Sequence, residues 1–260
     1  MNPENNQNMD IEQIDNPEKY GRNVEVNVFL LRHAEKTSSR NLSEAVGPAT
    51  ALSDKGIMDA ENFGRELKDK HPELQHIKVY HSGVNRAETT GRLIAGEDSI
   101  YSPRKRKSLA LEGKITQDAF NILTAEAKAE GGSEATMIQK LLDANETPLD
   151  DRSMTSTEIG QIVASNILRM VEMSRKFLSN SKANIVFISH AGVIEHFLVD
   201  LLKAERQNFI ADKLSGGLEY LEGPEISIKR KDKDQVSLNV KFRDYDFSIS
   251  EDELRKLSGK

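Results

Sequence analysis

The chain of 260 residues contains no cysteine. This absence excludes disulfides, thiolate zinc sites and every enzyme with a cysteine nucleophile, the cysteine-dependent phosphatases included. The chain also lacks an excess of basic residues, because its formal net charge is −6 at pH 7. General nucleic-acid binders carry a basic surface, so we expect no nucleic-acid partner.

Long apolar segments are missing as well, since no window approaches the length of a transmembrane helix. The first residues, MNPENNQNMD, lack the basic and then apolar pattern of a signal peptide. We therefore expect a cytoplasmic protein with no membrane partner. The GxGxxG, P-loop and GxSxG motifs are absent too, which leaves nucleotide-binding and serine-hydrolase functions without support.

The sequence does contain apolar strands that alternate with amphipathic helices. Val24, Val26 and Val28 alternate and lead into the apolar residues 29–31, which predicts a strand that becomes buried on both faces. Two further strands are predicted over 77–80 and 185–188. A helical pattern follows each of the three strands.

A late hairpin completes the expected sheet. Val236, Leu238, Val240 and Phe242 alternate strictly after the turn-like sequence KRKDKD, which is typical of an antiparallel hairpin near a sheet edge. Strands that alternate with helices predict an α/β fold. We expect a three-layer α/β/α sandwich with a mostly parallel central sheet and an antiparallel strand.

One domain is expected over residues 23–250. Residues 1–22 are rich in Asn, Gln and Glu, so we expect a disordered polar tail there. A helical insert is expected around residues 97–155, with two short helices on either side of a Gly-Gly break. The last segment, 251–260, is expected to be a C-terminal tail.

Each buried strand is followed by histidine or arginine. The first strand runs into Arg32 and His33. The second runs into His81, with Arg86 one turn further on, and the third runs into His190. In such sheets, ligands bind outside the carboxyl ends of the strands. A pocket with two histidines and two arginines suits a phosphate or a polycarboxylate.

These residue types also suit phosphoryl transfer. The transferring group spreads negative charge over its oxygens, so positioned cations supply most of the catalysis. A neutral imidazole attacks phosphorus without prior deprotonation, provided that a hydrogen bond holds its other ring nitrogen. The HAE motif at residues 33–35 has no partner set with metal-ligand spacing, so we expect no metal and no cofactor.

Five segments, in order, resemble motifs of the histidine phosphatase superfamily, the phosphoglycerate-mutase-like proteins. The family's Arg-His-Gly signature is similar to LLRHAEKT, and its next helix is similar to LSDKGIMDAENFGREL. Its second arginine and second catalytic histidine are matched by VYHSGVNRAETTGRL and VFISHAGVIEHFL. Its closing hairpin resembles ISIKRKDKDQVSLNV. The resemblance spans most of residues 24–243 and implies the family's fold and a phosphatase activity.

The resemblance also implies roles for single residues. His33 is implied as the phosphorylated nucleophile and His190 as the second catalytic histidine. The implied phosphate pocket consists of Arg32, Arg86, His190 and the amide of Ala191. Lys36 and His81 are candidates for substrate contact.

The proton donor is the least determined part of the predicted site. Release of an alkoxide needs a donor, which is usually a carboxyl group. The family's glutamate lies about two dozen residues after the second arginine, and Glu112 stands at a similar place. The glycine-rich continuation is missing, and some members that act on phosphohistidine proteins lack this acid. Glu112 is therefore the candidate acid, and a site without one is the alternative.

We expect a metal-independent phosphatase that acts on a phosphorylated small molecule or a phosphoprotein. Two alternatives stay open from the sequence. A phosphoglycerate-type mutase would use the middle segment as a lid over the pocket. A binding module would use the same pocket to recognise phosphorylated partners with little turnover.

Overall fold

The computed structural model describes residues 19–37, 51–70, 77–144 and 147–260. Most of the predicted disordered tail, residues 1–18, lies outside these ranges. Its last residues do not extend freely, because Tyr20 forms a β-bridge with Leu178. The Gly21 N–H also donates to the Phe177 carbonyl at 2.9 Å.

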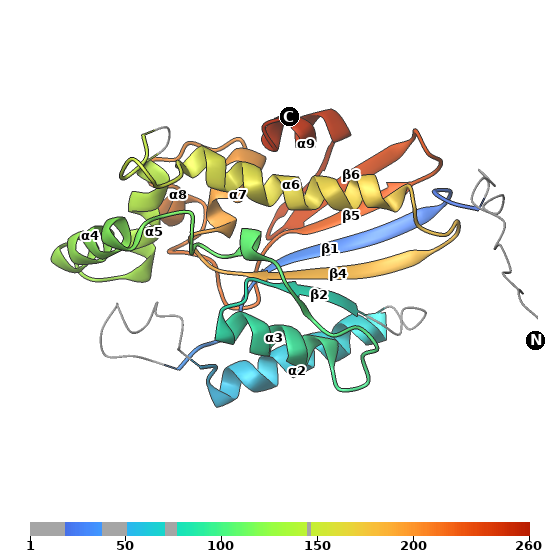
Figure 1. Cartoon of the computed structure of the whole chain (residues 1–260), viewed down its shortest axis with the longest axis horizontal. Coiled ribbons are helices and arrows are strands. Elements are labelled where there is room, and N and C mark those ends of the chain that lie inside the picture. The colour runs from blue at the N-terminus through green and yellow to red at the C-terminus, as the bar shows by residue number, and fades with distance from the viewer. Residues whose placement is uncertain (1–18, 38–50, 71–76, 145–146) are drawn as a thin grey trace, which may run out of the picture.

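A single sheet of seven strands in the order β3-β2-β4-β1-β5-β6-β7 forms the centre of the described part of the chain (Figure 1). The strands are β1 (Val24–Arg32), β2 (Ile77–His81), β3 (Arg104–Lys105), β4 (Lys182–Ser189), β5 (Glu225–Arg230), β6 (Val236–Phe242) and β7 (Tyr245–Ile249). Strands β1 to β4 are parallel to one another, and β5, β6 and β7 extend the sheet in antiparallel pairs. The mostly parallel α/β sheet predicted from the sequence is confirmed.

The antiparallel part is larger than the predicted hairpin. Strands β5 and β6 are that hairpin, and β7 adds a further strand at the edge. In β7 Ile249 is buried, whereas its other residues are half-buried or exposed. An edge strand with so little buried surface has a weak apolar signature, which is why the sequence pattern did not predict it.

The helices cover the two faces of the sheet unequally. They are α2 (Asp54–Lys70), α3 (Asn85–Ala95), α4 (Gln117–Ala129), α5 (Glu134–Asp143), α6 (Ser156–Ser174), α7 (Ile194–Leu201), α8 (Phe209–Asp212) and α9 (Glu251–Leu257), with a short 3₁₀ helix η2 (Lys107–Leu109). Helices α2 and α3 lie on one face, whereas α6, α7 and α9 lie on the other (Figure 1). None of the helices in the described ranges is both long and apolar enough to cross a membrane.

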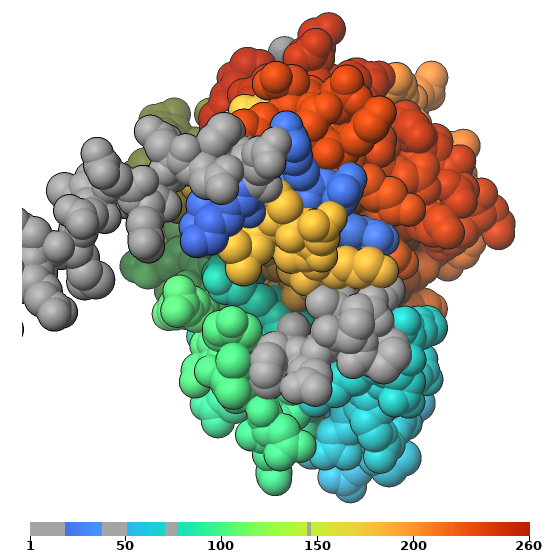
Figure 2. Space-filling model, turned by 90° about the vertical axis from the view of Figure 1, so that its right-hand side faces the viewer, coloured from blue at the N-terminus to red at the C-terminus, as the bar shows by residue number. Residues whose placement is uncertain are grey.

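Strand β1 is buried on both faces because it lies between these layers. Val28 and Leu30 belong to the apolar cluster that includes α6 and α7. Phe29 and Leu31 belong to the opposite cluster, with residues of α2 and α3. Figure 2 looks onto one end of the molecule, where residues of the β1 region (blue) and of the β4 region (gold) lie side by side, between cyan and green segments below and orange-red C-terminal segments above. The apolar run in the sequence therefore reflects burial from two sides.

The predicted middle helices are α4 and α5, which a Gly-Gly break separates. Thr116 and Ser133 cap the two helices by accepting backbone N–H groups of their first turns. Both helices lie at one end of the sheet, beside α8 (Figure 1). This position brings the insert to the carboxyl end of β1.

The last ten residues differ from the predicted tail. Ser250 and Glu253 form a capping box that starts α9. Leu254 of this helix is completely buried and packs in the same apolar cluster as α6. The segment is mostly charged, so its single buried leucine gave little indication of packing in the sequence.

Candidate active site

The strand register aligns the ends of the three central strands. Arg32 of β1 pairs with Ser189 of β4, and His81 of β2 pairs with Ile188 of the same strand. The residues that follow these positions therefore leave the sheet at one level. His33 and His190 are the next residues of β1 and β4.

Four predicted residues come together at this edge. The imidazole rings of His33 and His190 lie 5.2 Å apart between centroids. Arg86, in the first turn of α3, donates from Nε to His33 Nε2 at 2.9 Å and lies with Nη2 3.4 Å from His190 Nδ1. Arg32 precedes His33 on the same strand. All four side chains are buried, so their charges and lone pairs act in a site that is largely shielded from water.

Hydrogen bonds fix the tautomer of His33. Its Nδ1 lies 2.8 Å from the carbonyl oxygen of Ala34, which only accepts, so Nδ1 carries the proton. The lone pair is therefore on Nε2 and points to Arg86. Burial holds the pKa of His33 well below its ordinary value, and the charges of His190 and Arg86 lower it further. The ring is neutral at neutral pH, with its free nitrogen in the cluster.

His190 is also held in a neutral form. Burial is the main reason that its pKa lies well below the ordinary value, and Arg86 adds to the effect. Its Nε2 lies 2.7 Å from the hydroxyl of Ser82, the residue after β2. Ser82 received no role from the sequence, although the strand-end argument placed it at this edge.

Thr90 links the first motif to the second. The Ala34 N–H donates to Thr90 Oγ1 at 3.0 Å, and the same hydroxyl donates to the carbonyl of Arg86 at 2.7 Å. Thr90 lies one turn after Arg86 on α3 and is completely buried. It therefore fixes the loop after His33 relative to the helix that carries Arg86.

Arg32 has partners that the sequence did not predict. Its Nη1 donates to the Leu218 carbonyl, and its Nη2 contacts Glu134 Oε2 at 2.9 Å. Its guanidinium also lies over the ring of Tyr220, 4.4 Å from the centroid. Leu218 and Tyr220 belong to the loop before β5, and Glu134 is the first residue of α5. These contacts arise from segments far away in the sequence, and no local motif marks them.

The remaining predicted site residues are Lys36, His81 and Ala191. Lys36 is buried and lies 3.2 Å from Glu134, so it belongs to the cluster. His81 accepts the Gly83 N–H at Nδ1 and has its charged neighbours on α3 and β3. Ala191 follows His190 and is half-buried. The roles of these residues stay predictions.

Glu112 lies outside the hydrogen-bonded cluster, and its role as the acid stays a prediction. It forms a β-bridge with Ile115 shortly after η2. Within the described ranges, no hydrogen bond or ion pair joins Glu112 to Arg32, His33 or His190. The carboxylate that contacts the cluster is instead Glu134.

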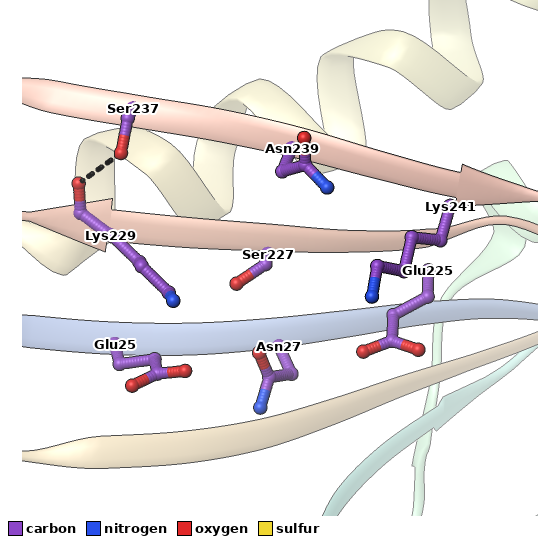
Figure 3. Close-up of a pocket in the computed structure, with 8 residues that line it drawn as sticks. All are labelled: Glu25, Asn27, Glu225, Ser227, Lys229, Ser237, Asn239 and Lys241. Carbon is purple, nitrogen blue, oxygen red and sulfur yellow. Dashed lines mark hydrogen bonds between the residues drawn. The ribbon is translucent and has the colours of Figure 1, made fainter. Parts of the chain in front are cut away.

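A second hollow lies on the polar face of the sheet, away from these residues. Asn27, Ser227 and Asn239 lie side by side across β1, β5 and β6, with Glu225 and Lys241 nearby (Figure 3). The residues that line it include neither histidine nor arginine, so it offers no nucleophile of the predicted kind. In the described part of the chain, no group of three or more His, Asp or Glu residues is arranged to hold a metal ion.

The fold and the cluster together define a class of protein. It has an open α/β sheet with two neutral histidines and two arginines at the carboxyl edge of its parallel strands. Such a site binds an anion and presents a nucleophilic nitrogen to it.

Three solved structures show the similarity in fold. The mycobacterial glucosyl-3-phosphoglycerate phosphatase is 17% identical, with a TM-score of 0.51 over 84% of this chain and 97% of that one. Phosphoglycerate mutase from Bacillus anthracis is 17% identical, with a TM-score of 0.50 over 91% and 98%. A putative alpha-ribazole-5'-P phosphatase from Escherichia coli is 18% identical, with a TM-score of 0.50 over 84% and 96%.

One stretch of the sequence matches a family model. Residues 28–110, which include Arg32, His33 and Arg86, match the model of the histidine phosphatase superfamily (branch 1). No curated protein matches the chain. Residues 28–110 are thus similar to the histidine phosphatase superfamily, and the described part of the chain has a phosphoglycerate-mutase-like fold. The structural relatives named above include both phosphatases and a mutase.

Proposed function

We propose that the protein is a phosphatase that hydrolyses a phosphomonoester or a phosphoprotein through a phosphohistidine on His33. The observation that carries this proposal is the unprotonated Nε2 of His33, whose lone pair accepts a hydrogen bond from Arg86 Nε at 2.9 Å in a buried cationic cluster. A lone pair held in this way is ready to attack an anion that the arginines attract.

The first step transfers the phosphoryl group to His33. Phosphate oxygens take the place of His33 Nε2 as acceptors for Arg86, and Arg32 binds the same group. The Nε2–phosphorus bond forms while the bond from phosphorus to the leaving oxygen breaks, and that oxygen takes up a proton. Arg32 and Arg86 stabilise the negative charge that spreads over the oxygens in the transition state.

The second step returns the protein to its starting form. A water molecule attacks phosphorus, the Nε2–phosphorus bond breaks, and inorganic phosphate leaves after a proton is removed from the water. The pKa of His190 is depressed mainly by burial, so we assign this residue a hydrogen-bonding role toward the phosphate with no positive charge.

A phosphoglycerate-type mutase is the second candidate. The observation that favours it is the ion pair between Glu134 of the insert and Arg32, because it brings α5 to the mouth of the pocket. A mutase needs a pocket that retains its intermediate. Isomerisation of 3-phosphoglycerate by the purified protein would favour the mutase, whereas release of inorganic phosphate favours the phosphatase.

Trapping of the intermediate tests the proposal. The wild-type protein, quenched during turnover of 4-nitrophenyl phosphate, should carry an acid-labile and alkali-stable phosphoryl group. The His33→Ala variant should form none and should lose turnover by at least about 10³-fold, because the nucleophile is gone.

Binding of vanadate shows whether the variant is still folded, so that a loss of turnover can be assigned to the missing nucleophile. His33→Ala should still bind vanadate, because Arg32 and Arg86 are unchanged. Turnover that survives in His33→Ala contradicts the mechanism. Wild-type protein that binds vanadate without any turnover would instead identify a phosphate-recognising module.

A further inference from the structure

Glu134 is the residue of the cluster that neither the sequence nor the family match indicated. It is the first residue of α5, in the helical insert, and follows the N-cap Ser133. Its carboxylate lies 2.9 Å from Arg32 Nη2 and 3.2 Å from Lys36 Nζ. A carboxylate of the chain therefore lies where the predicted site would bind an anion.

This contact differs from an ordinary surface ion pair. The side chains of Arg32 and Lys36 are 10% and 7% exposed, and that of Glu134 is 28% exposed. Burial by itself would raise the pKa of Glu134, but the two cations outweigh it and hold the pKa below the usual value. Glu134 is thus an anion in the free protein, and part of its side chain stays exposed where a ligand can reach it.

Glu134 is linked to the reacting histidine through its partner Arg32. Its partner Arg32 lies over Tyr220, whose ring centroid is 5.9 Å from that of His33. The charge of Glu134 also acts on Arg86 and raises its pKa, although burial has the larger and opposite effect. A phosphate between Arg32 and Arg86 would therefore lie next to this carboxylate.

Other carboxylates near the strand ends are occupied or out of contact. Glu35 accepts the Ser53 hydroxyl at 2.7 Å, at the start of α2. Glu195 accepts the Gly192 N–H at 2.7 Å and is completely buried, whereas the side chain of Glu134 is 28% exposed. Glu112 does not contact the cluster. Glu134 is the acidic side chain that combines contact with the cluster and exposure on one side.

We propose that Glu134 is the proton-transfer residue of the reaction, which donates a proton to the leaving oxygen and later accepts one from water. This inference rests on the proposed phosphatase mechanism. An incoming phosphate competes with Glu134 for Arg32 and Lys36 and releases the carboxylate from them. The released carboxylate faces the phosphate's own charge, which favours uptake of a proton.

The proton balance closes over the two steps. In the first, the carboxyl proton of Glu134 passes to the leaving oxygen as its bond to phosphorus breaks. In the second, the Glu134 carboxylate removes a proton from the water that attacks the phosphohistidine. Glu134 is then protonated again. As phosphate departs, Glu134 releases this proton to solvent, which balances the proton taken up when the substrate bound, and the carboxylate re-forms its ion pairs.

The test compares Glu134→Gln with the wild-type protein on two aryl phosphates. Phenyl phosphate has a poor leaving group and needs the proton, so its kcat/KM should fall by about 10²–10⁴-fold. The 4-nitrophenolate group leaves readily without a proton. The rate at which 4-nitrophenyl phosphate forms the phosphoenzyme should therefore change little in the variant. Vanadate should bind more tightly to the variant, because the competing negative charge is gone.

Two further variants make the outcome decisive. Glu130→Gln removes a carboxylate at the end of α4 that pairs with Lys140 of α5 at 2.8 Å, and this variant should leave both rates unchanged. Equal losses on both substrates in Glu134→Gln would show a structural role and overturn the inference. A selective loss in Glu112→Gln in place of Glu134→Gln would overturn it too.

Failure of this inference is distinct from failure of the proposed function. If His33 is phosphorylated in the wild type but Glu134→Gln turns over phenyl phosphate normally, the phosphatase mechanism stands and the role of Glu134 is refuted. If the wild type forms no phosphohistidine, the proposed mechanism is refuted first, and the inference is refuted with it.

Discussion

At the scale of single residues, the hydrogen bond between Arg86 and His33 gives the most information about the candidate site. It joins the predicted nucleophile to a guanidinium that is 7% exposed. The planar fork of arginine can hold His33 through Nε and still direct Nη2 to His190. Geometry of this kind depends on the side chain itself and not only on its charge.

Arg86→Lys should therefore lower kcat on 4-nitrophenyl phosphate by about 10²-fold or more, because lysine supplies a point charge without the fork. Steady-state kinetics measure the effect. Arg92→Lys is the matched control, since Arg92 lies on the same helix, is exposed, and pairs with Glu88. Similar rates for the two variants would show that the charge of Arg86 suffices.

At this scale the sequence predicted the convergence of Arg32, His33, Arg86 and His190, because each follows a recognisable strand. It did not predict Glu134, whose position in a polar segment looks like ordinary solvated surface. Only the packing of α5 against the end of the sheet gives this residue its two cationic partners. Glu112 was therefore the candidate acid from the sequence, and Glu134 was not considered.

The position of helix α3 depends on a glycine, which has no side chain, in the neighbouring helix α2. Gly64 lies in the middle of α2, and a Cβ atom there would be 2.5 Å from the Ile94 carbonyl oxygen of α3. The two helices approach closely at this glycine and cover β2 and β4 together. Since α3 carries Arg86, this contact contributes to the position of the guanidinium.

We expect Gly64→Ala to destabilise the protein by about 1–3 kcal/mol, because the helices must move apart. The sign of the change in the free energy of unfolding is diagnostic, since alanine stabilises an ordinary helix interior by about 1 kcal/mol relative to glycine. Urea unfolding measures the change. Glu61→Ala, at an exposed site of α2, should have little effect. A Gly64→Ala protein as stable as the wild type would contradict the close packing.

In the described part of the molecule, four histidines are buried with pKa values below the ordinary one, namely His33, His81, His190 and His196. His33 and His190 lie in the site, and His196 lies on α7 with Nδ1 2.7 Å from the Ser156 hydroxyl. Burial lowers the pKa of His196 to about 3, and the charges of Arg206 and Lys114 add to the effect. Such residues bind protons in the unfolded chain before they bind them in the folded protein.

This difference predicts destabilisation in acid. The unfolded chain takes up protons as the pH falls through about 6.5, so each neutral histidine then costs about 1.4 kcal/mol of stability per pH unit. For His196 the loss continues down to a pH of about 3. The free energy of unfolding should decline below pH 6.5, and His196→Gln should decline less steeply. Urea titrations at pH 7.5, 6 and 5 test this, and parallel curves for the two proteins would contradict it.

The sequence by itself determined the order of strands and helices, the α/β class and the four residues that meet in the predicted site. These features depend on local periodicity and on the fact that parallel strands end at one edge. Tertiary structure decided the third antiparallel strand, the packing of α9 and the partners of Arg32. It also placed Glu134, from a helix 100 residues along the chain, beside Arg32 and Lys36. The physical reason is that a buried ion pair depends on which surfaces meet, and that is a property of the packed molecule and not of any segment alone.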